Sequence, residues 1–196
     1  MKYIILILLF SVSVLGVTKD DTRNIILNGN FQTWQRGTSL TLVPASTQTY
    51  RADRWQAFNT LATGTIYYGQ GMNVHSKSSD YTALLDVGTT QASVAASEFS
   101  RFSYIIHGPD IKSLIGKWVT LNFKVFMGGT YATNLPVSIF NLDGSATNAS
   151  IVFDYSVTNG TWVEHSFSFY LDPSDSYTTS EGSAGFYINF GVACGS

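Results

Sequence analysis

The sequence has 196 residues, of which only 12% are charged, and its formal net charge is −2. A chain with so few charges and no basic run is unsuited to nucleic acid, which proteins bind through lysine and arginine at the phosphates. Its single cysteine excludes an intrachain disulfide, and a chain of this length buries about 70% of its unfolded surface without one. Aromatic residues reach 14% and glycine is frequent, as is typical of β-rich proteins with many turns.

The first residues have the pattern of a secretory signal peptide. A positive residue at Lys2 precedes an almost unbroken apolar run to Leu15, and the small side chains of Val14 and Gly16 suit a cut before Val17. The apolar run is too short for a comfortable membrane span. An exported chain without disulfides is more typical of bacteria or viruses than of animal extracellular modules.

The domain organisation follows from this pattern. We expect a signal peptide at residues 1–16, with an uncleaved N-terminal anchor as the alternative, and one domain at residues 17–196. The expected location is therefore outside the cell or on a virion surface.

Alternation of apolar and polar residues is the main signal along the rest of the chain, and it predicts strands buried on one side. The clearest case is KWVTLNFKVF (residues 117–126), in which every second residue from Val119 to Val125 is apolar and the intervening residues are polar. WVEHSFSFYL (residues 162–171) repeats the pattern. The full set of predicted strands is 65–68, 81–86, 99–106, 117–126, 137–142, 151–155, 162–171 and 186–192.

Turn signals separate these strands, and helix is almost absent. Glycine pairs and Asn-Gly or Asp-Gly dipeptides mark the turns, and the one helical piece is a single turn at residues 109–114 before Gly116. Strands at this spacing predict an all-β fold, an antiparallel β-sandwich of two packed sheets. Phe123, Phe167 and Phe190 should then meet in one interior.

An unusual motif, NGNFQTWQRG (residues 28–37), is followed by ADRW (residues 52–55). We interpret the two as a structural clasp, in which aromatic rings plug one end of the sandwich and arginines donate to Asp53 or to backbone carbonyls. A ligand site at this point would instead require the Trp34 or Trp55 ring to be exposed. The clasp comprises Asn28, Phe31, Trp34, Arg36, Asp53, Arg54 and Trp55.

These motifs resemble the start of a jelly-roll domain found at the ends of phage tail fibres. YIIHGPDIKSLIGKWVTLNFKVF (residues 104–126) and NGTWVEHSFSFYL (residues 159–171) are similar to later blocks of that family. The resemblance implies a jelly roll, a homotrimer and an exposed place on a virion. The opening motif is also similar to that of jelly-roll carbohydrate-binding modules, in which an acidic residue after the Asn-Gly-x-Phe motif helps to hold calcium. Gln32 stands there in this chain, and a neutral amide is a weaker calcium ligand, so we expect no metal and no cofactor.

Catalytic signals are weak. No nucleophile elbow, phosphate loop or metal-ligand spacing is present, and His165 falls on the apolar side of its predicted strand, which favours a core position. The acidic pairs that could serve a glycosidase are Asp172 with Asp175 and Glu98 with Asp110, although carboxylates in turns are mostly solvated caps.

Sugar binding is the chemistry that the residues favour, because sugar rings stack on aromatic side chains while amides and carboxylates bind their hydroxyl groups. TIYYGQGMN (residues 65–73) offers two consecutive tyrosines, which in a strand point to opposite sides, so that only one can be in the core. The candidate ligand-binding residues are Tyr67, Tyr68, Gln70, Asn73, Tyr104 and Tyr131.

Three functional hypotheses follow. The leading one is a non-enzymatic domain that binds a cell-surface glycan or polysaccharide, with trimerisation multiplying weak contacts. The second is a structural virion or envelope protein that binds no sugar. The third and least favoured is a glycan-cleaving enzyme, which would need two carboxyl groups facing each other across a groove.

Overall fold

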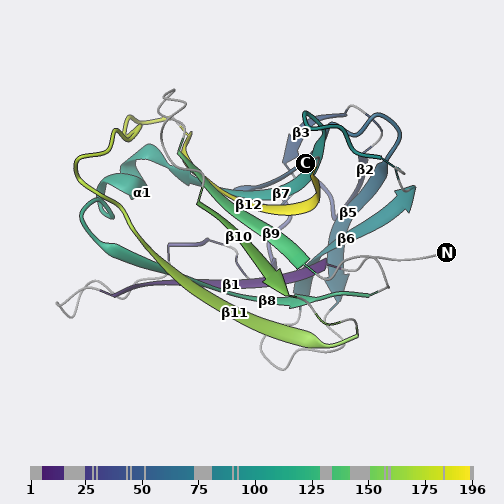
Figure 1. The fold of residues 1–196 in the computed structure, drawn as a ribbon, viewed down its shortest axis with the longest axis horizontal. Helices are drawn as coiled ribbons and strands as arrows, with labels where there is room; N and C mark the ends of the chain where they lie inside the picture. The colour runs from purple at the N-terminus through teal and green to yellow at the C-terminus, as the bar shows by residue number, and fades with distance from the viewer. Residues whose placement is uncertain are drawn as a thin grey trace.

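In the described part of the chain, the regular structure consists of strands and one short helix (Figure 1). The computed structural model describes residues 6–15, 25–27, 29, 31–42, 44, 46–50, 52–72, 81–89, 91, 93–128, 134–141, 151–156, 158, 160–182 and 184–194. The strands in this part of the chain form two six-stranded sheets, and every named pairing is antiparallel.

The first sheet has the strand order β11-β8-β1-β6-β5-β2. Its strands are β1 (Leu6–Leu15), β2 (Ser39–Leu42), β5 (Thr65–Met72), β6 (Tyr81–Thr89), β8 (Trp118–Phe126) and β11 (Trp162–Tyr170).

The second sheet has the order β10-β9-β12-β7-β4-β3. Its strands are β3 (Ser46–Tyr50), β4 (Trp55–Asn59), β7 (Phe99–His107), β9 (Asn134–Asn141), β10 (Ile151–Ser156) and β12 (Ala184–Cys194). The helix α1 (Gly108–Lys112) follows β7 directly, with Pro109 in its first turn, where a missing N–H costs nothing.

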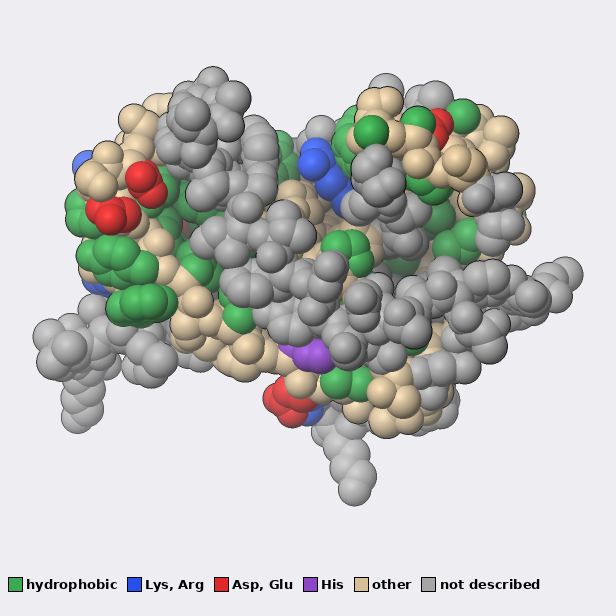
Figure 2. All heavy atoms as spheres, in the orientation of Figure 1, with side chains coloured by type: hydrophobic (Ala, Val, Ile, Leu, Met, Phe, Trp, Pro, Cys, Tyr) green, Lys and Arg blue, Asp and Glu red, His purple; other side chains and the backbone are tan. Residues whose placement is uncertain are grey.

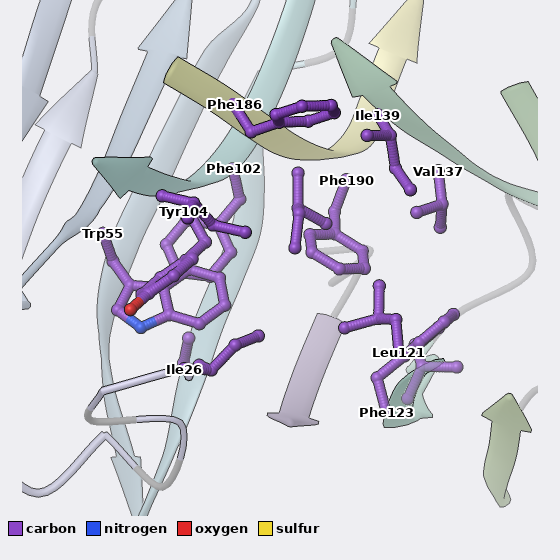
Figure 3. Packing of buried hydrophobic residues seen from close by; sticks show 14 of the residues in the cluster. Ile26, Trp55, Phe102, Tyr104, Leu121, Phe123, Val137, Ile139, Phe186 and Phe190 are labelled. Atoms are coloured by element: carbon purple, nitrogen blue, oxygen red, sulfur yellow. The ribbon is translucent and has the colours of Figure 1, made fainter. Parts of the chain in front are cut away.

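The two sheets share one hydrophobic core (Figure 3). Phe123 of β8 meets Phe190 of β12 edge to face, with ring centroids 5.4 Å apart, and Phe167 of β11 belongs to the same cluster. The three phenylalanines therefore meet in a shared interior as predicted, and the all-β fold is confirmed.

Burial follows the alternation that the sequence shows. In β8 the side chains of Val119, Leu121, Phe123 and Val125 are buried, and in β11 the exposed residues are the polar ones of the pattern together with Tyr170. The single helical turn also lies where it was predicted, and Gly116, which follows it, has a φ of 78° in the left-handed region that suits glycine.

Strand β1 is the main difference from the sequence-based expectation. The sequence pattern predicts that this segment is a leader outside the domain, whereas in the structure it lies between β8 and β6 in the first sheet. Its residues Ile7 to Leu15 pair with Phe126 to Trp118, and its first residues pair with β6. Cleavage before Val17 stays a prediction.

Candidate functional site

The motif at residues 28–37 packs into the core. Phe31 is fully buried with a φ of 56°, and its ring lies 4.9 Å from that of Trp55. The indole N–H of Trp34 donates to the Phe31 carbonyl at 2.6 Å, and Trp34 pairs with Ala52 through an isolated bridge. These contacts tie the opening segment to the second motif, whose Trp55 stacks on Phe102 at 4.7 Å.

The arginine contact of this region differs from the expected one. The guanidinium of Arg54 donates to Asp110 of α1 at 2.7 Å, whereas the sequence suggested Asp53 or backbone carbonyls. Arg36 is exposed and Asp53 is half-buried, and Asn28 lies outside the described residues. Trp55 is fully buried and Trp34 is half-buried against the core, so the contacts observed for the two tryptophans are packing contacts.

The candidate ligand residues fall into three groups. Tyr68 and Tyr104 are buried, with 1% and 0% exposure, so the surface role predicted for them is corrected to a core role. The Tyr104 hydroxyl accepts from the backbone N–H of Leu27 at 2.9 Å and donates to the carbonyl of Ile25.

Gln70 is also occupied within the fold, because its amide donates to the Phe31 carbonyl at 2.8 Å. Asn73 and Tyr131 lie outside the described residues. Of the six candidates, Tyr67 is therefore the described residue whose ring is at the surface.

Tyr67 lies on the outer face of the first sheet and is 46% exposed. Its ring packs against Gly88 of β6, where an added Cβ would overlap the ring atoms. Asp86 stands directly opposite Tyr67 in the register. The Oδ1 atom of Asp86 is buried and has no hydrogen-bond partner among the described residues, and this desolvation raises the pKa of Asp86. The ring of Tyr67 and the carboxylate of Asp86 therefore form a cross-strand pair on the first sheet.

A second set of aromatic rings lies on the same outer face, along the paired strands β8 and β11. We call this set the β8–β11 strip and define it as five cross-strand pairs: Trp118 with Tyr170, Thr120 with Ser168, Asn122 with Ser166, Lys124 with Glu164, and Phe126 with Trp162. Residues directly opposite in an antiparallel pair project from the same face, so the strip is one continuous surface.

Aromatic pairs occupy both ends of the strip. Trp118 and Tyr170 are 55% and 43% exposed, with ring centroids 5.6 Å apart. At the other end Phe126 and Trp162, both half-buried, lie 5.7 Å apart. The strip was not predicted from the sequence, although Trp118 and Phe126 alternate in step with the polar residues of the predicted strand.

The middle of the strip is polar and its charges compensate each other. The hydroxyl groups of Thr120 and Ser168 are hydrogen-bonded at 2.7 Å, and Lys124 lies 3.5 Å from Glu164.

In Figure 2, hydrophobic side chains reach the surface near α1, and few of the coloured side chains are charged.

The register relates Tyr67 to the strip. One row of paired residues crosses the sheet from β5 to β11: Gly69, Leu84, Ile7, Phe126 and Trp162. Tyr67 lies two residues before Gly69 on β5, so it is next to this row along the strand. Three strand spacings, or ~14 Å, separate β5 from β8. Tyr67 is therefore close to the Phe126 end of the strip and far from the Trp118 end.

The second sheet also carries a group of aromatic rings, and the guanidinium of Arg101 packs over them. The guanidinium of Arg101 lies 4.8 Å from the ring centroid of Phe99, 5.6 Å from that of Phe58 and 5.8 Å from that of Tyr187. Such cation–π contacts occupy the faces that a ligand would use, so the exposed rings of the first sheet are the better candidates.

The acidic pairs considered for catalysis serve local structure. Glu98 accepts from the backbone N–H groups of Ala62 and Ala95, and hydrogen bonds, chiefly that from Ala95, lower its pKa. Asp172 accepts from the N–H and hydroxyl of Ser174, which lowers the pKa of Asp172.

The partners in these pairs are engaged as well. Asp110 is the ion-pair partner of Arg54, and Asp175 accepts from the hydroxyl of Tyr177 at 3.3 Å. A general acid needs a raised pKa, and Glu98 and Asp172 are shifted the other way.

Other kinds of site are absent from the described residues. They contain no group of three or more His, Cys, Asp and Glu side chains placed to hold a metal ion, and no helix among them has the length and apolarity needed to cross a bilayer. No protein-family model, curated protein or solved structure matches this chain.

Proposed function

We propose that the protein binds neutral glycans on the outer face of its first sheet and catalyses no reaction. The observation that carries this proposal is Tyr67, whose ring is 46% exposed, packs against Gly88 and stands opposite Asp86. Sugar rings present apolar C–H faces that pack on an aromatic ring, and a neighbouring carboxylate accepts hydrogen bonds from their hydroxyl groups.

The proposed architecture is a jelly roll similar to the phage tail-fibre head. In support of it, the chain changes sheet at each step from β6 to β9 and again from β10 to β12. The chain would act outside the cell or on a virion surface, where a homotrimer would combine three weak sites into tight attachment.

A glycan array tests the function directly. We expect the intact protein to bind neutral glycans, Tyr67→Ala to lose about tenfold in affinity, equal to about 1.4 kcal/mol, and Tyr67→Phe to keep most of the binding because it keeps the ring. Leu27→Ala is the matched control, since Leu27 is an equally exposed apolar side chain. Natively folded protein that binds no glycan would contradict the proposal.

The second candidate is a structural virion or envelope protein. The exposure of Trp118 and Tyr170 favours it, because large exposed apolar side chains also mark protein interfaces. Light scattering on the same samples distinguishes the two functions. Large assemblies without glycan binding would support the structural protein, and glycan binding by monomers or trimers would support the glycan-binding domain.

A further inference from the structure

We propose that the β8–β11 strip is a second, elongated binding site and that its ligand is a linear neutral polysaccharide lying along the strands. This inference rests on the proposed function and deepens it, because it names the class of glycan. All residues of the strip lie on β8 and β11, outside residues 1–16.

The length of the strip points to a polymer. Eight residue steps separate Trp118 from Phe126, which corresponds to ~26 Å along the strand. An aromatic pair stands at each end of this distance, so a single sugar unit can touch only one of them. A ligand that uses both pairs must be a chain of several units.

The charge and chemistry of the middle point to a neutral polymer. Ser166 and Ser168 are exposed and supply hydroxyl groups that can exchange hydrogen bonds with sugar hydroxyls, and the half-buried Asn122 stands opposite Ser166 on the same surface. Lys124 and Glu164 form an ion pair, so the strip has no net charge. An acidic polymer such as nucleic acid or a polyuronate would find no excess of positive charge here.

Backbone pairing holds the two strands of the strip together along its whole length. Beyond its Trp118 end, Gly116 donates to the Leu171 carbonyl at 2.7 Å and Leu171 donates to the Lys117 carbonyl at 3.2 Å. The pairing then runs without interruption from Trp118 to Phe126. A preformed surface loses little conformational entropy on binding, which favours useful affinity from shallow contacts.

Calorimetry with oligosaccharides of increasing length tests the inference. The probes are linear oligomers, from dimer to hexamer, of the neutral polymers of glucose, mannose, xylose and galactose, with a galacturonic acid hexamer as the charged comparison. We expect affinity for one of the neutral series to rise about tenfold or more from dimer to hexamer, and to change little between ~50 and ~500 mM salt because no net charge is involved.

Two variants locate the effect. Trp118→Ala and Tyr170→Ala should each reduce hexamer affinity about tenfold and reduce the dependence on length, whereas Leu27→Ala should preserve both. Far-UV circular dichroism and thermal melting establish that each variant is folded, and Trp118→Phe, which retains a ring, should recover much of the affinity.

The outcomes separate this inference from the proposed function. Glycan binding that depends on Tyr67 but neither on ligand length nor on Trp118 would overturn the inference and leave the function intact. Preference for the acidic hexamer, with a steep loss at high salt, would also overturn the inference. Absence of binding to every neutral series and to the glycan array would overturn both.

Discussion

The ring of His165 lies beside that of Phe123, on the side of β11 that faces the core, with centroids 5.3 Å apart. Burial lowers the pKa of His165 from its ordinary value of 6.5, because the charged imidazolium is desolvated. The folded state therefore resists protonation. The contribution of His165 to the free energy of unfolding is therefore fully present above pH 6.5, its pKa in the unfolded chain. This contribution is lost as the pH falls through the lower pKa of the folded state.

We expect the difference in unfolding free energy between the natural chain and His165→Phe to change in favour of the variant as the pH is lowered from ~7.5 to ~5. Urea unfolding of both proteins at each pH measures this difference. A difference independent of pH, or an NMR titration that places the pKa of His165 at or above 6.5, would contradict the prediction.

The burial of individual tyrosines could be predicted only in part from the sequence. The alternation of a strand predicts that one of Tyr67 and Tyr68 is buried, and the structure places Tyr68 inside and Tyr67 outside. The choice between them depends on which face of β5 meets the core. Tyr104 was misassigned because the middle of β7 is buried on both faces, where a polar-looking tyrosine finds its partners in the backbone of Ile25 and Leu27.

At the scale of elements, the packing of α1 on β12 depends on the absence of a side chain at Gly185. A Cβ at this position would overlap Cδ1 of Ile111 and lie 2.8 Å from the carbonyl oxygen of Thr178. Gly185 stands at an irregularity in the pairing of β12 with β7, where glycine commonly permits close approach. The helix can therefore rest directly on the strand.

Gly185→Ala should lower the free energy of unfolding by about 1–3 kcal/mol through overpacking, as measured by urea unfolding. Ile111→Val removes the Cδ1 atom but leaves the Thr178 carbonyl in place. Gly185→Ala should therefore cost less free energy of unfolding in the Ile111→Val background than in the natural chain, although some cost should remain. Equal losses in both backgrounds would mean that the helix and the strand are not in contact at this point.

Strands with one solvated face give the clearest signal in the sequence. Strands β8 and β11 were predicted to within one residue because their polar and apolar positions alternate strictly. Strand β4 was missed because it is buried on both sides: Gln56 and Asn59 are inside together with Trp55 and Ala57, which removes the alternation. The β8–β11 strip required, in addition, the register that places Tyr170 beside Trp118, and a single sequence does not contain pairing information.

At the scale of the whole molecule, the sequence of residues 1–16 combines features of a leader with features of a strand. An apolar run after a positive residue is typical of a leader, yet β1 lies between β8 and β6. A signal of the strand is present in FSVSV (residues 10–14), where Ser11 and Ser13 alternate with apolar residues. In the register, Val12 stands opposite buried Leu121.

The two roles predict different effects of substitutions in the intact chain, expressed without export. In the register, Val12 pairs with Leu121, which is buried in the core, and Ser13 pairs with Thr120. If β1 is a structural strand, Val12→Asp introduces a carboxylate at the register position of a core residue and should cost more than about 2 kcal/mol. Ser13→Asp should stay within about 0.5 kcal/mol. A chain that starts at Val17 should also be less stable, because β8 loses one of its two partner strands along the whole of its length. Equal effects of the two substitutions, together with undiminished stability of the shortened chain, would mean that the first sheet closes without β1 and that residues 1–16 act only as a leader.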